Sequence, residues 1–158
     1  MAIIVEDGSI VANANSYVSY ANYIAWTTER GITVTGNQAT TEEHILRAMD
    51  YIESQNFIGR KANKSQSLQW PRTEVYVDSY SINANEIPKE LKDSVYEVTV
   101  TVAAGNFALS VKDRQTTQEK IGEITVTYKN NASMKAQTPA VTAALRKIIK
   151  PFSLVSRA

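Results

Sequence analysis

The clearest helical spacing of apolar positions predicts a helix over residues 41–54. Ile45, Met49 and Ile52 recur at intervals of three and four residues, which places them on one helical face. Thr40, followed three residues later by a glutamate, fits the capping box that begins many helices. We therefore expect this helix to contribute an apolar stripe to a core.

Three further helices are marked by a capping serine, a proline near the start or a glycine past the end. They are expected from Ser16 or Ser19 to Gly31, from Pro88 to about Ser110, and from Pro139 through Ile149. Residues 94–102 also suit a strand, because valines alternate there with threonines, and the pattern permits either element. We expect a helix in this stretch.

Strict alternation over residues 122–128 predicts a β-strand, which together with Ile121 lies within an arm of about residues 113–135. The side chains expected on one face of this strand are Ile121, Ile124, Val126 and Tyr128. A single strand cannot satisfy its own backbone, so a partner is required. The candidates are residues 75–77, the apolar run near the N-terminus, or the same arm of an adjacent subunit.

A tryptophan followed at once by a proline predicts a fixed corner at residues 67–72. Proline disfavours a helical residue before it and donates no backbone hydrogen bond. Leu68, Trp70 and Pro71 would therefore form a corner between helical segments, with the indole either filling the core or exposed as a binding anchor. Arg72 beside them could join a salt bridge, a subunit interface or a phosphate.

Together these elements predict one mainly α-helical domain over residues 1–158. It would be a small bundle of about four helices with a protruding strand or hairpin arm, extended termini and a C-terminal tail over residues 151–158. A length of 158 residues with 43% apolar content suffices for a core. The sequence holds no cysteine, which excludes disulfides and thiolate metal sites.

Two sequence features argue against a membrane or secreted protein. No apolar run approaches the roughly 18 residues that a membrane span needs. The first residues lack the basic segment and long apolar core of a signal peptide, so we expect synthesis in the cytosol.

The distribution of charge is more informative than its total of +1, which is far from the basic balance of a general nucleic-acid binder. Residues 1–57 hold seven acidic and two basic side chains, a balance of −5, whereas residues 119–158 hold seven basic and two acidic ones, a balance of +5. Such a split suits either head-to-tail assembly of copies or neutralisation within one chain.

One basic stretch, residues 58–73, contains no acidic side chain. Its cations are Arg60, Lys61, Lys64 and Arg72. This loop is the one local patch that could contact DNA phosphates, although its charges would equally suit the acidic half of a neighbouring subunit. It lacks the glycine spacing of a phosphate-binding loop.

No catalytic constellation is found in the sequence. His44 is the only histidine and has no evident catalytic partner, so we expect it to be a solvated surface residue. There is no metal-ligand cluster, dinucleotide fingerprint or nucleotide-binding loop. We therefore expect neither enzymatic activity nor a cofactor or metal.

Several segments together resemble a known family. The segments are Ile4 to Gly8, Ala12 to Ser19, Leu46 to Ile52, Gly59 to Lys61, Leu68 to Arg72, Ile87-Pro88 and Glu119 to Tyr128. Their order and spacing resemble the head–tail connector, or adaptor, proteins of tailed bacteriophages. Related sequences are also labelled DnaT-like single-stranded-DNA-binding proteins.

The resemblance implies a virion subunit, assembled in the host cytoplasm, that sits at the neck between head and tail. Its copies would form a homo-oligomeric, twelve-fold ring beneath the portal protein, above a tail or stopper protein, with genomic DNA passing through the lumen. The strand of the arm would reach out of the helical body. The tail residues expected to contact the portal are Phe152, Leu154, Val155 and Arg157.

Two functions therefore compete at this point. The favoured one is a structural connector subunit, because a DNA conduit should not grip DNA and the net charge is near zero. The alternative is a single-stranded-DNA-binding protein that uses the basic loop of residues 60–72, with bases stacked on Trp70 or Tyr76.

Overall fold

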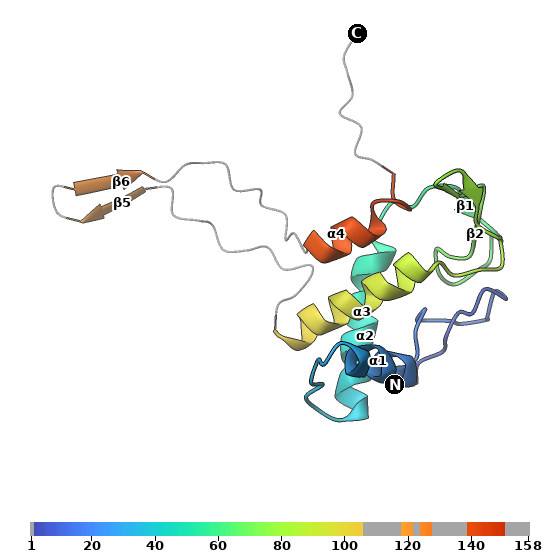
Figure 1. Ribbon diagram of the computed structural model, residues 1–158, viewed down its shortest axis with the longest axis horizontal. Coiled ribbons are helices and arrows are strands. Elements are labelled where there is room, and N and C mark those ends of the chain that lie inside the picture. Colours follow the sequence, from blue (N-terminus) through green and yellow to red (C-terminus); the bar gives the residue numbers. More distant parts are fainter. Residues whose placement is uncertain (1, 106–117, 122–123, 128–138, 151–158) are drawn as a thin grey trace, which may run out of the picture.

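A computed structural model describes residues 2–105, 118–121, 124–127 and 139–150. Within these residues the chain forms four helices and three small two-stranded sheets, which confirms the prediction of a small, mainly helical fold (Figure 1). The elements are α1 (Tyr20–Glu29), α2 (Gln38–Glu53), β1 (Arg60–Lys61), β2 (Arg72–Thr73), β3 (Tyr76–Val77), β4 (Tyr80–Ser81), α3 (Lys89–Ala103), β5 (Gln118–Ile121), β6 (Ile124–Thr127) and α4 (Pro139–Leu145).

The N-terminal segment folds around a buried carboxylate. Glu6 has no exposed surface, and its carboxylate accepts backbone hydrogen bonds from Gly8, Ile10 and Val11 at 2.8, 3.0 and 2.9 Å. These charge-assisted bonds compensate the burial of the charge. A parallel bridge between Val5 and Ser16 then leads the chain to α1.

Helix α1 begins as predicted, but α2 begins earlier than the sequence pattern indicated. Ser19 caps α1 by accepting a hydrogen bond from the Asn22 amide. In α2 the cap is Asn37, whose side chain accepts from the Thr40 amide at 2.9 Å, so the predicted capping box at Thr40 is wrong. Asparagine caps helices at least as well as threonine, which explains the earlier start.

Helix α3 settles the ambiguous stretch of residues 94–102 in favour of a helix. The hydroxyl groups of Ser94, Thr99 and Thr101 donate to carbonyls four residues earlier, so these polar groups are satisfied within the helix. The helix ends at Ala103 rather than at about Ser110. Gly105 follows with a positive φ of 79°, a conformation that commonly ends helices.

Helix α4 is shorter than predicted, because it ends at Leu145 and not at Ile149. The residues after it pair instead with the loop that follows α2. The Ile58 amide donates to the Ile148 carbonyl at 3.0 Å, and the Lys150 amide donates to the Asn56 carbonyl at 2.8 Å. An antiparallel bridge between Phe57 and Ile149 completes this closure.

The core lies where α3 packs against both α2 and α4, and α1 packs against α2 (Figure 1). Each helix turns an apolar stripe toward this centre, and α3 has the longest run of buried positions. The fully buried apolar side chains include Ile45, Ile52, Leu91, Val95, Val98 and Ile148.

The predicted arm contains a β-hairpin that stands apart from the helices in Figure 1. Strand β5 pairs antiparallel with β6, with Ile121 opposite Ile124 and Gln118 opposite Thr127. Ile121 belongs to β5 and Ile124 to β6, so the predicted single strand is two strands that pair with each other. Residues 75–77 and the N-terminal run are therefore wrong as partners, whereas pairing with the arm of an adjacent subunit stays a prediction. Tyr128 and the tail residues Phe152, Leu154, Val155 and Arg157 lie outside the described residues.

Candidate functional site

The tryptophan–proline corner lies inside the protein. Trp70 has no exposed surface, and its ring meets that of Phe57 edge-on at 5.9 Å between ring centres. Leu68 and Pro71 are buried as well, and the Trp70–Pro71 peptide bond is cis. The segment lies between β1 and β2, within the long connection from α2 to α3, so it does not join two helices directly. Its indole is therefore inaccessible to a base.

A buried polar network fixes this corner to α2. The Tyr17 hydroxyl donates to the Glu53 carboxylate and accepts from the Trp70 amide at 3.1 Å. The Gln69 amide donates to the other Glu53 oxygen at 2.9 Å. Burial raises the pKa of Tyr17 far above its ordinary value, and the neighbouring Glu53 charge adds to this shift.

The same burial raises the pKa of the Glu53 carboxyl above its ordinary value. Hydrogen bonds from Tyr17 and Gln69 oppose that shift, as do the charges of Lys61 and Arg72, but burial has the larger effect.

Arg72 acts as a structural clamp. It is only 7% exposed, and its guanidinium donates to the carbonyls of Ile58 at 2.7 Å, Gly59 at 2.9 Å and Gln69 at 3.2 Å. Five donors in a planar fork allow one side chain to join these separate loop segments. Because the donors are occupied inside the fold, this cation is unavailable to a phosphate.

The other three predicted contact residues are exposed. Arg60 and Lys61 form β1, and Lys64 lies in the loop between β1 and β2. Arg60 stands opposite Thr73 and Lys61 opposite Arg72, so their side chains point to opposite faces of the ribbon. The structure thus brings the three cations to one ribbon, but their side chains do not converge on a single binding point.

The Arg60 side chain is already paired with an acid. Its Nε lies 3.2 Å from a carboxylate oxygen of Glu74, with both side chains more than half exposed. Such an exposed pair is weak, so it constrains Arg60 without removing it from solvent.

Two exposed tyrosines lie on the β3–β4 hairpin, which follows β2 along the chain. Tyr76 is 63% exposed and Tyr80 is 80% exposed, whereas Val75 just before them is fully buried. The hairpin continues from β2, and the Ile82 amide bonds the Val75 carbonyl at 2.9 Å. The sequence indicated Tyr76 as a stacking candidate but missed Tyr80, whose only signal is an aromatic residue in a turn-rich polar stretch.

We call this region the ribbon surface. It comprises Arg60, Lys61, Lys64, Tyr76 and Tyr80. Exposed cations beside exposed rings are the groups that track a nucleic-acid backbone and stack on its bases.

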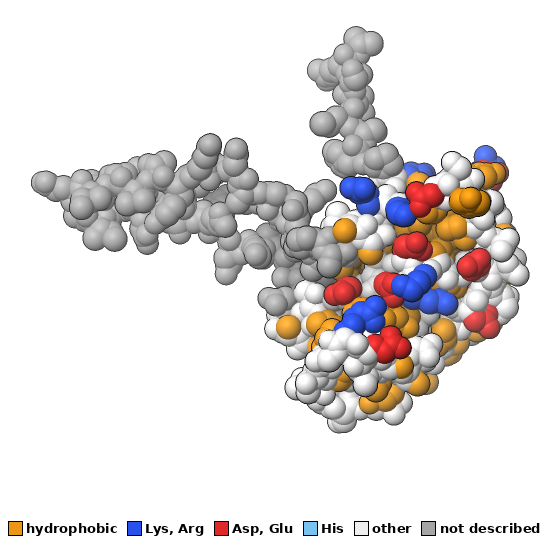
Figure 2. Space-filling view, in the orientation of Figure 1, with side chains coloured by type: hydrophobic (Ala, Val, Ile, Leu, Met, Phe, Trp, Pro, Cys, Tyr) orange, Lys and Arg blue, Asp and Glu red, His pale blue; other side chains and the backbone are white. Residues whose placement is uncertain are grey.

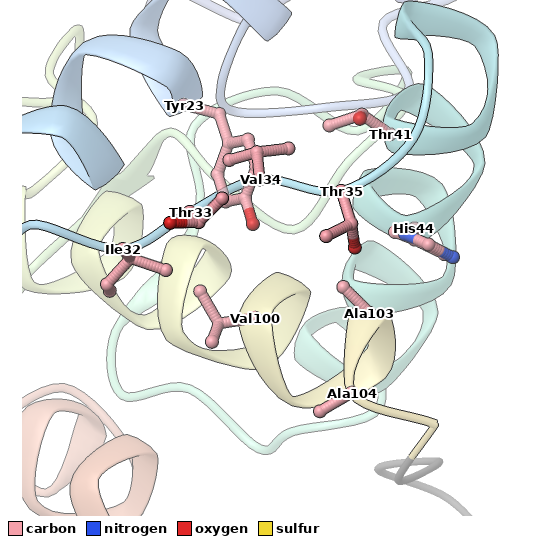
Figure 3. A pocket seen from close by; sticks show the side chains of 10 residues that line it. All are labelled: Tyr23, Ile32, Thr33, Val34, Thr35, Thr41, His44, Val100, Ala103 and Ala104. Carbon is pink, nitrogen blue, oxygen red and sulfur yellow. The ribbon is translucent and has the colours of Figure 1, made fainter.

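A separate hollow of about 170 Å³ lies between the α1–α2 loop, α2 and the end of α3 (Figure 3). Its lining carries threonine hydroxyls, the Tyr23 ring and His44 beside aliphatic groups. His44 is half-buried at its edge rather than freely solvated. No carboxylate is among the lining residues in the described part of the chain, so the imidazole has no acid–base partner there.

Acidic and basic side chains are mixed over the face shown in Figure 2. Among the described residues, no group of three or more histidines, cysteines or acids is placed to hold a metal ion. In the same residues no helix has the length and apolar character needed to cross a membrane.

The described residues thus define a small, mainly helical protein with an exposed basic and aromatic ribbon and a separate hairpin. Residues 1–157 match the family described as "Putative DnaT-like ssDNA binding protein", and the chain belongs to this family. No curated protein and no solved structure matches the chain. The DnaT-like part of the resemblance is confirmed, whereas the connector part stays a prediction.

Proposed function

We propose that the chain binds single-stranded DNA through the ribbon surface. The observation that carries the proposal is the exposure of Tyr76 and Tyr80 on the hairpin that follows the β1–β2 ribbon with its three exposed cations, in a chain whose family is described by this activity. Exposed rings stack on bases of any sequence, and lysine and arginine neutralise the backbone between them.

The proposal differs from the site expected from the sequence in two residues. Trp70 is buried under Phe57, and Arg72 donates to internal carbonyls. Neither can reach a DNA strand on the surface, so the exposed tyrosines of the β3–β4 hairpin replace the tryptophan as the candidates for stacking. The phosphate contacts then come from Arg60, Lys61 and Lys64.

The binding is expected to be moderate and strongly dependent on salt. The net charge of the chain is +1, so long-range attraction of DNA is small. About three phosphate contacts on a single strand give a slope near −2 in a plot of log K against log salt concentration.

Fluorescence anisotropy of a labelled oligothymidine titrated with the full chain tests this proposal. Binding should weaken as salt rises, and Arg60→Glu combined with Lys64→Glu should abolish it. Lys89→Glu combined with Lys92→Glu, at α3 residues outside the ribbon surface, makes the same change in net charge and should leave most of the affinity. Absence of binding at low salt, or equal loss in both double variants, would refute the proposal.

A second candidate, a structural subunit of a phage head–tail connector, is favoured by the β5–β6 hairpin. The hairpin pairs with itself and stands apart from the helices (Figure 1). An isolated two-stranded hairpin is marginal in water, and its open edges are suited to strand addition by a neighbour. In such a ring the copies would surround DNA, with a portal protein above and a tail or stopper protein below.

Mass measurement of the chain alone and with a portal protein tests this candidate. A connector subunit forms a ring or docks on the portal and does not bind oligonucleotides appreciably. A single-stranded-DNA-binding protein binds the oligonucleotide whether or not it oligomerises. A chain that stays monomeric with a portal present would count against the connector.

A further inference from the structure

The strand that carries Tyr76 is anchored from beneath. Val75 is fully buried, and a Cβ placed on Gly59 would lie 2.6 Å from the Val75 side chain, so these two positions are in close contact. In the hairpin register Tyr76 stands opposite the small Ser81, whereas Tyr80 stands opposite Val77. Since side chains alternate along a strand, the two tyrosines point to opposite faces of the hairpin.

The outward face around Val75 collects three side chains of different chemistry. Tyr76 follows Val75, Glu74 precedes it, and Arg60 follows Gly59 and pairs with Glu74 at 3.2 Å. Glu74 has a positive φ of 58°, which turns the chain between β2 and β3. The exposed ring of Tyr76 therefore follows, two residues along the chain, the acid that pairs with the Arg60 cation.

We infer that Tyr76 is the principal base-stacking residue and that Glu74 competes with DNA phosphate for Arg60. The inference deepens the proposed function and rests on it. A base flipped against the Tyr76 ring would place its flanking phosphate near Arg60, where the Glu74 carboxylate must first be displaced. Duplex bases are already stacked on each other, so this arrangement selects single strands.

Glu74 then sets how tightly the DNA strand is bound. Its carboxylate holds the arginine in an exposed ion pair and also repels an approaching phosphate. Removing this charge frees Arg60 and lessens the repulsion, so a neutral residue at position 74 should tighten binding. This effect is opposite in sign to that of most substitutions in a binding site.

Four single variants measured by the same anisotropy titration test the inference. Tyr76→Ala should weaken oligothymidine binding by about tenfold, since stacking on one ring contributes about 1–3 kcal/mol. Tyr76→Phe keeps the ring and should bind like the native chain. Tyr80→Ala, the matched control on the opposite face, should have the smaller effect. Glu74→Gln should tighten binding a few-fold.

The preference for single-stranded over duplex DNA gives an independent readout. Tyr76→Ala should lose this preference while keeping the salt dependence, because the phosphate contacts stay. If the native chain binds but Tyr76→Ala binds equally well, or Glu74→Gln weakens binding, the inference is wrong and the proposed function stands. If the native chain does not bind at all, both are wrong.

Discussion

At the scale of single residues, Arg72 shows how a cation that looks suited to DNA can be structural. Its guanidinium joins the loop after α2 to the tryptophan corner through carbonyls of Ile58, Gly59 and Gln69. These bonds inside the fold, and not a ligand, compensate for the burial of the guanidinium charge.

Arg72→Ala should lower the free energy of unfolding by about 2–4 kcal/mol, because several buried carbonyls lose their donor. Arg72→Lys should recover only part of the loss, since an ammonium group cannot reproduce the planar fork. Chemical denaturation measures both variants. Native stability in Arg72→Ala, with DNA binding lost instead, would show that Arg72 acts at the DNA surface.

The buried Glu53 predicts a pH dependence of stability. Its pKa is raised in the folded chain, so ionisation favours the unfolded state. This destabilising contribution is absent below the ordinary pKa of 4.5 and complete once the pH exceeds the folded pKa. The stability of the native chain relative to Glu53→Gln should therefore fall as the pH rises through this window.

Thermal unfolding of both proteins between about pH 4 and pH 7 measures this difference. Glu43→Gln, at an exposed position of the same helix, serves as the control for removal of one carboxylate. A native chain that gains stability over Glu53→Gln as the pH rises would contradict the account.

At the scale of single residues, the sequence predicts where a corner lies better than it predicts which groups each side chain contacts. Trp70 before a proline indicates a corner, and its size favours the interior that the structure shows. The place of Arg72 could not be predicted, because it depends on carbonyls that the loop of residues 57–59 leaves unpaired. The exposure of Tyr80 likewise depends on the register of the β3–β4 hairpin.

At the scale of elements, the start of α2 separates two capping schemes. Asn37→Ala should lower the free energy of unfolding by about 1 kcal/mol, because its side chain accepts the Thr40 amide. Thr40→Ala should cost less, since the threonine only donates its hydroxyl to Asn37 at an exposed site. Denaturation curves show which of the two variants loses more stability. A larger loss in Thr40→Ala would support the capping box instead.

Two glycines with similar backbone angles offer a matched test of how tightly β1 packs on β2. Gly59 and Gly31 both have positive φ, at 71° and 66°. A Cβ at Gly59 would lie 2.3 Å from the Thr73 carbonyl, whereas one at Gly31 would meet nothing within 4 Å.

Gly31→Ala should therefore cost only the backbone strain, about 1 kcal/mol. Gly59→Ala should cost about 2 kcal/mol more, because the Thr73 backbone must move. Thermal denaturation compares the two variants directly. Equal destabilisation would mean that the Thr73 backbone shifts at little cost in free energy, so that β1 is not tightly packed on β2.

Helices were the more predictable elements because their apolar spacing is set locally. The four predicted helices are present, and the errors are confined to their ends. Strand β5 was missed because its sequence is polar, and its pairing with β6 is not visible in an apolar pattern. Ambiguous residues 94–102 are helical because burial against α2 and α4 outweighs the strand preference of valine.

At the scale of the whole molecule, a helical body carries two features that packing within it does not explain. One is the ribbon surface with its exposed tyrosines, and the other is the hairpin that stands apart. Of the acids in the first segment, Glu6 and Glu53 are bonded inside the fold, so these two carboxylates are not available to another copy. The proposed DNA binding would use the ribbon surface and the proposed assembly would use the hairpin, so the two proposals can be tested separately.

The most direct test of the central claim is a titration of the isotopically labelled chain with oligothymidine of about ten nucleotides, followed by amide chemical shifts. The account predicts shifts at residues 60–64 and 73–81, with α1 and the β5–β6 hairpin unchanged. Shifts confined to the hairpin, or no shifts at all, would contradict it.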